Sequence, residues 1–135
     1  MRTPIAVLTL VFALSPFAAA QEVPQQGEAA ELALKQIAAL RVHDFARAYE
    51  LVSAEFRRNF TAREYEWMVK RAHPEVASSE FAFVVRTHDA DGFVYVTVKL
   101  RGKNGKNAEA LYEMVREKGV LKVNAVSSRG DDGLL

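Results

Sequence analysis

The spacing of apolar side chains changes between the first and second halves of the chain. From Glu28 to His73 they recur every three or four residues, which places them on one face of a helix. From Glu80 onward they occupy every second position, as in a half-buried strand. The pattern therefore predicts helices followed by strands, an order typical of α+β domains.

The helical half is predicted to contain three helices, over residues 28–41, 44–52 and 61–73. Asp44 can cap the second, because its carboxylate can accept hydrogen bonds from amides of the first turn. The third begins with Thr61-Ala62-Arg63-Glu64, a capping box. It is expected to end at Pro74, because proline disfavours the helical conformation of the residue before it.

The second half contains two clear hairpin signals, Asp91-Gly92 and Asn104-Gly105. Residues 107–118 are ambiguous, because they are rich in helix-forming residues and their apolar positions also fit a helix. The glycines on either side, Gly105 and Gly119, instead suit a strand between two turns.

The pattern Asp44, Ala48-Tyr49, Ser53, Phe56, Tyr65 and Met68-Val69 resembles a bacterial family of unknown function. That family belongs to the nuclear-transport-factor-like superfamily, also called the cystatin-like α+β fold. The resemblance covers residues 28–128 and implies that 107–118 is a strand. It also implies three helices packed on a curved four-stranded antiparallel sheet, with a cone-shaped pocket between the two layers.

The first 20 residues have the three-part layout of a secretory signal peptide. Arg2 precedes an apolar run over residues 5–14, and Ala18-Ala19-Ala20 provides a cleavage site. Residues 21–27 are expected to form a flexible leader and 129–135 a disordered tail. We therefore expect a periplasmic or secreted protein that has no membrane attachment after cleavage.

Charge and composition restrict the partners. The chain has 18 basic and 17 acidic residues, and loss of Arg2 with the signal peptide balances them. This balance argues against nucleic acid or an anionic membrane as a partner. The sequence contains no cysteine, so no disulfide can form. His43, His73 and His88 lack metal-ligand spacing and are expected at surface or capping positions, so neither a metal nor a cofactor is expected.

No acid–base pair or nucleophile stands out, and we identify no catalytic residue from the sequence. We therefore expect a non-catalytic domain that binds a small apolar ligand or a protein partner through the cone or the sheet. The alternative is an isomerase, cyclase or hydrolase with its active site in the cone. The residues expected to line the pocket are Tyr49, Tyr65, Trp67 and Tyr112.

The strand over residues 93–100 carries apolar side chains on both faces. Val94, Val96 and Val98 lie on one face, and Phe93 and Tyr95 on the other. A sheet with one face in water usually alternates more strictly. Phe93 and Tyr95 are therefore candidate interface residues, and a homodimer formed through the sheet is one interpretation. Scattered apolar surface residues are the other.

Overall fold

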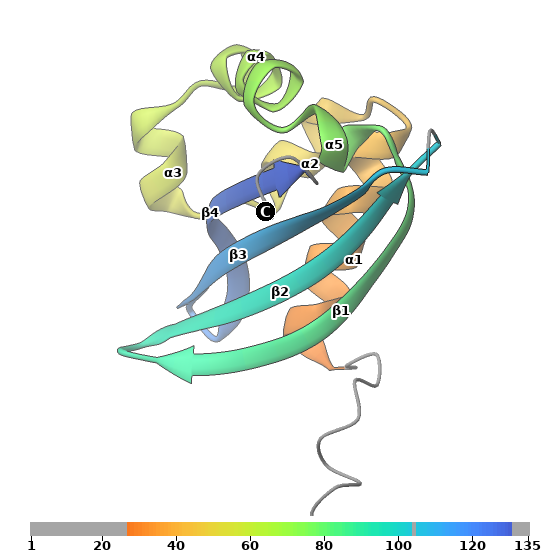
Figure 1. Ribbon diagram of the computed structural model, residues 1–135. Coiled ribbons are helices and arrows are strands. Elements are labelled where there is room, and N and C mark those ends of the chain that lie inside the picture. The colour runs from red at the N-terminus through yellow and green to blue at the C-terminus, as the bar shows by residue number, and fades with distance from the viewer. Residues whose placement is uncertain (1–26, 104, 131–135) are drawn as a thin grey trace, which may run out of the picture.

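The computed structural model describes residues 27–103 and 105–130 (Figure 1). Within these residues, five helices precede four strands, and the helices gather against one face of the sheet (Figure 1). None of the described helices is both long and apolar enough to cross a membrane. The elements are α1 (Glu28–Arg41), α2 (Phe45–Glu50), α3 (Ala54–Asn59), α4 (Ala62–Ala72), α5 (Pro74–Ala77), β1 (Ser79–Ala90), β2 (Phe93–Gly102), β3 (Asn107–Glu117) and β4 (Val120–Gly130).

The predicted helix starts are confirmed by their hydrogen bonds. Asp44 accepts from the Arg47 amide at 3.1 Å. The capping box of α4 is complete, because Thr61 Oγ1 accepts from the Glu64 amide at 3.1 Å and Glu64 Oε1 accepts from the Thr61 amide at 2.9 Å. These bonds satisfy amides that would otherwise lack partners at the helix ends.

The expected number of three helices is too low, because two short helices lie beside the predicted ones. Ser53 caps α3 by accepting from the Phe56 amide at 3.1 Å. Pro74 ends α4 as expected, since His73 has left the helical conformation with φ −132° and ψ 46°. The same proline is the first residue of α5, a position where its missing amide hydrogen costs nothing.

The sheet is an antiparallel meander in the order β1-β2-β3-β4. Residues 107–117 form a strand, which confirms the implication of the family resemblance over local helix propensity. The β3–β4 turn places Lys118 and Gly119 at φ 51° and 82°, the left-handed values that a two-residue hairpin turn requires. Figure 1 shows the long strands bending across α1.

The last strand is longer than expected. Arg129 pairs with Glu109 and Gly130 with Ala108, so these two residues belong to the sheet and not to a tail. Residues 131–135 lie outside the described part of the chain. So do residues 1–26, which include the predicted signal peptide and almost all of the leader.

The core lies between α1 and the sheet. Val96, Val98 and Leu100 on β2 are buried opposite α1, which contributes Ala33 and Ile37. The segment between α2 and α3 is fixed to β4, because Val52 and Val123 form a parallel bridge. This bridge holds α2 and α3 beside β4.

Candidate functional site

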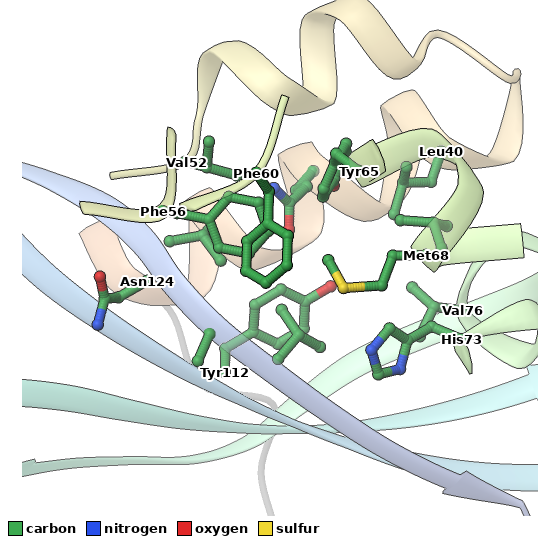
Figure 2. A pocket seen from close by; sticks show the side chains of 15 residues that line it. Leu40, Val52, Phe56, Phe60, Tyr65, Met68, His73, Val76, Tyr112 and Asn124 are labelled. Carbon is green, nitrogen blue, oxygen red and sulfur yellow. The ribbon is translucent and has the colours of Figure 1, made fainter. Parts of the chain in front are cut away.

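A cavity of about 190 Å³ lies between the helical layer and the end of the sheet (Figure 2). Its wall is mainly apolar and combines residues from α1, the α2–α3 segment, α4, α5, β3 and β4. A dry apolar cavity of roughly 150 Å³ can hold benzene, so this one suits a small monocyclic molecule. The residues lining it are Gln36, Leu40, Val52, Phe56, Phe60, Tyr65, Met68, Val69, His73, Val76, Tyr112, Val123, Asn124, Ala125 and Val126.

Aromatic rings form the helical side of the wall. The ring centroids of Phe56 and Phe60 are 4.9 Å apart, and Phe56 meets Tyr65 edge-on at 5.7 Å. Phe56 lies in α3, Phe60 in the segment that follows α3, and Tyr65 in α4. The three rings therefore form one aromatic surface at the junction of α3 and α4. Each such ring pair stabilises the folded protein by about 0.5–1.5 kcal/mol beyond the effect of burying the rings. The contacts therefore hold the rings of the cavity wall in place.

A β-bulge shapes the strand side. The β3–β4 register shifts between Glu113 and Met114, so Asn124 has no direct partner across the strands. Asn124 lines the cavity, but its polar atoms are engaged. Its Oδ1 accepts from Ser53 Oγ at 2.6 Å and its Nδ2 donates to Glu113 Oε2 at 2.8 Å. Asn124 therefore joins α3 to the sheet.

Tyr112 contributes the most unusual polar group. The residue on β3 is fully buried at 0% exposure, and its hydroxyl has no hydrogen-bond partner among the described residues. Figure 2 shows this hydroxyl directed into the cavity beside Met68. Burial raises the pKa of Tyr112 far above its ordinary value, so the phenol keeps its proton. An unpartnered buried hydroxyl is costly, which makes it a natural contact for a ligand.

His73 contributes a second polar group, supported by a chain of hydrogen bonds. Its Nδ1 lies 2.6 Å from Ser128 Oγ, and Ser128 Oγ lies 2.5 Å from Glu75 Oε1. Burial lowers the pKa of His73, and the nearby Glu75 carboxylate partly opposes that effect. The chain links the α4–α5 junction to β4.

The four tyrosine and tryptophan residues expected in the pocket divide into two pairs. Tyr65 and Tyr112 line the cavity. Tyr49 does not line it; its ring packs 5.7 Å from that of Tyr65, and its hydroxyl donates to the Phe60 carbonyl at 2.5 Å. Trp67 does not line this cavity either, because it lies on the outer side of α4 with 60% exposure, where Arg71 covers its ring.

The sequence did not point to His73 or Ser128 as site residues. His73 was expected at a surface or capping position, and it is the C-cap residue of α4, but it is also half-buried in the cavity wall. Ser128 is 55 residues away, and no local pattern relates the two.

Phe93 and Tyr95 lie on the face of the sheet opposite the core and are half-buried. Their rings are neighbours at 6.3 Å, and Tyr95 donates to Glu113 Oε1 at 3.3 Å. Strand pairing places Phe81 and Leu111 on the same face, with 68% and 42% exposure. The apolar character of this face is therefore greater than the two predicted residues indicate.

Among residues 27–103 and 105–130, no three histidine, aspartate or glutamate side chains are grouped to hold a metal ion. The candidate site is therefore defined by its apolar wall, the Tyr112 hydroxyl and the His73 imidazole.

Comparison with known proteins places the chain in a family. No curated protein matches it. Among solved structures, Aln2 from a Streptomyces species shares the fold, with a TM-score of 0.53 and 19% sequence identity over 79% of this chain and 90% of Aln2. The sequence matches the domain of unknown function DUF4864 over residues 23–133. Since this match spans most of the chain, the protein belongs to the DUF4864 family.

Proposed function

We propose that this protein binds a small, mainly apolar molecule in the cavity between its helices and β4. The observation that carries the proposal is the Tyr112 hydroxyl, which is buried, directed into an apolar cavity and without a protein partner in the described chain. A ligand oxygen that accepts from this hydroxyl would satisfy it, while the aromatic wall would cover the apolar part of the ligand.

The test is ligand binding by wild type and by Tyr112→Phe, followed by isothermal titration calorimetry. Acetophenone supplies one carbonyl acceptor, and ethylbenzene has a similar size without it. We expect wild type to bind acetophenone several-fold more tightly than ethylbenzene, and Tyr112→Phe to lose that preference, since one neutral hydrogen bond contributes about 1 kcal/mol. Absence of binding for both molecules would reject the proposal.

Acid–base catalysis in the same cavity is the second candidate function. The His73–Ser128–Glu75 chain favours it, because a neutral imidazole can act as a base and the un-ionised Tyr112 can donate to a developing oxyanion. Uptake of solvent deuterium at the methyl carbon of acetophenone, measured by mass spectrometry, tests this function. Exchange that depends on His73 would support catalysis, and exchange at the buffer rate would favour binding alone.

The sheet face opposite the helices supports a further proposal, self-association of two copies. The exposed Phe81 and Leu111 add to Phe93 and Tyr95 on that face. Sedimentation velocity should show a dimer that Phe81→Ser and Tyr95→Ser convert to monomer. A wild-type monomer at micromolar concentration would contradict it.

We also infer that the DUF4864 family is a branch of the nuclear-transport-factor-like superfamily. The helical layer, the four-stranded meander and the cavity between them support this placement, together with the fold shared with Aln2. Export of the chain remains our proposal from Arg2, the apolar run and the Ala18-Ala19-Ala20 cleavage site. Intact-mass measurement of the protein from a bacterial periplasm should give a chain that begins at Gln21, and retention of residues 1–20 would contradict it.

A further inference from the structure

We propose that the cavity selects ligands that carry a hydroxyl group, such as small phenols and monocyclic alcohols, by a hydrogen bond from that hydroxyl to Nε2 of His73. This inference rests on the proposed ligand-binding function and specifies the chemical class of the ligand.

The direction of the hydrogen bonds determines which nitrogen of His73 is free. The Glu75 carboxylate can only accept, so the Ser128 hydroxyl donates its proton to Glu75 Oε1. Ser128 Oγ therefore accepts from His73, and Nδ1 of His73 carries the proton. In the neutral ring Nε2 is then an acceptor with an available lone pair.

The surroundings keep His73 in this neutral form near pH 7. Burial lowers the pKa of the imidazole, and this effect outweighs the nearby Glu75 carboxylate, which raises it. The other ionisable groups in the cavity wall are the phenols of Tyr65 and Tyr112, and burial raises the pKa of both. No described group of the wall carries a charge that would hold the imidazolium form.

The imidazole of His73 and the hydroxyl of Tyr112 both line the cavity. Figure 2 shows the imidazole and the Tyr112 hydroxyl on neighbouring sides of the space next to Met68. A hydroxyl group both donates and accepts, so a phenol or alcohol can serve both residues, whereas a ketone or an ether can serve only Tyr112.

The other polar residues of the wall already have partners that fix them. Asn124 bonds to Ser53 and Glu113. The amide nitrogen of Gln36 donates to the Ala48 carbonyl at 3.0 Å. His73 is therefore the residue of the wall whose hydrogen-bond chain leaves a defined acceptor toward the cavity.

The experiment compares 4-methylphenol with 4-fluorotoluene, which has a similar shape but no hydroxyl proton. Calorimetry on the wild-type chain should show roughly tenfold tighter binding of 4-methylphenol, the effect of about one good hydrogen bond. Equal affinities would overturn the hydroxyl preference and leave the proposed function standing. Binding of neither molecule would overturn both.

The variant His73→Asn assigns the preference to Nε2. Its amide nitrogen can still donate to Ser128, but it has no acceptor at the Nε2 position. We expect it to bind 4-fluorotoluene as wild type does and to lose most of the preference for 4-methylphenol, keeping only the part that Tyr112 contributes by donating to the ligand oxygen. A fully preserved preference would overturn the role of His73, and so would the same loss in the matched control His88→Asn, a histidine at an exposed position of β1.

A measurement on the wild-type protein keeps the inference testable if His73→Asn does not fold. Long-range ¹⁵N–¹H spectra identify the protonated nitrogen of each histidine. Addition of 4-methylphenol should shift the His73 Nε2 resonance and leave Nδ1 protonated, while 4-fluorotoluene should leave Nε2 unchanged. An unchanged Nε2 resonance in saturating 4-methylphenol would overturn the inference.

Discussion

Nδ1 of His73 and Oγ of Ser128 lie 2.6 Å apart although 55 residues separate them in the chain. The contact joins the α4–α5 junction to β4, and it continues to Glu75 at the start of α5. The cavity is therefore bordered at His73 by a polar chain, whereas most of its wall is apolar.

Replacing Tyr112 by phenylalanine should raise the free energy of unfolding of the ligand-free protein. The substitution keeps the ring and removes a buried hydroxyl without a partner, whose burial costs about 1 kcal/mol or more. Urea unfolding provides the measurement. The matched control is Tyr49→Phe, which removes the bond to the Phe60 carbonyl and should lower stability by about 1 kcal/mol. A loss of stability in Tyr112→Phe would show that the hydroxyl is satisfied in the free protein.

Replacing Thr61 by alanine should destabilise the protein by about 1 kcal/mol, because α4 loses the oxygen that accepts from the Glu64 amide. Thr61→Ser retains that oxygen and should stay close to wild type. Thermal unfolding followed by circular dichroism compares the two variants. Equal melting temperatures for both would show that the cap contributes little to α4.

The stability of the protein should decrease as the pH falls through the range in which histidine titrates. The pKa of His73 in the folded state is below its unfolded value of about 6.5, so the unfolded chain binds more protons in this range. The contribution of His73 is complete above the unfolded pKa and is lost as the pH decreases below it. Urea unfolding at about pH 7.5 and about pH 5.5 measures the change in the free energy of unfolding across that range.

Two variants separate His73 from the other groups that titrate. His73→Asn should have a smaller pH dependence than wild type, and His88→Asn, at an exposed position of β1, should match wild type. The Glu75 carboxylate favours the imidazolium form and so opposes the lowering of the His73 pKa. Glu75→Gln should therefore increase the pH dependence of stability. An identical pH profile in wild type and His73→Asn would contradict the buried, neutral histidine.

Trp67 and Met68 should respond differently to truncation although they are adjacent. Trp67→Ala removes an exposed ring and its contact with Arg71, so stability should change by less than about 1 kcal/mol and ligand binding should be unchanged. Met68→Ala enlarges the cavity and should cost more than about 1 kcal/mol. Weaker acetophenone binding in Trp67→Ala alone would place the ligand elsewhere.

The sequence was informative where neighbouring residues determine the structure. The Asp44 cap, the Thr61–Glu64 capping box, the end of α4 before Pro74 and the Asp91-Gly92 turn each depend on residues within one turn of chain. The strand over residues 107–117 is different, because local propensity favours a helix there. Pairing with strands on both sides outweighs that propensity, and the family resemblance supplied this information.

The cavity could be predicted only as an implication of the resemblance, and two of the four residues expected to line it, Tyr49 and Trp67, lie outside it. An aromatic residue on an amphipathic helix lies inside or outside according to the rotation of that helix against the sheet. The apolar repeat of α4 already separates Trp67 from the face of Tyr65 and Val69, whereas only the tertiary packing brings Phe56 and Phe60 to the cavity.

The amino-acid sequence by itself determined the order of helices and strands, the positions of most caps and turns, and the apolar face of each element. The tertiary structure alone decided which side chains meet, as in the bulge at Asn124, the unpartnered Tyr112 hydroxyl and the His73–Ser128–Glu75 chain. The physical reason is the distance along the chain between the residues that interact. Caps and turns depend on hydrogen bonds between neighbours in the chain, whereas a cavity depends on the packing of elements that are distant in sequence.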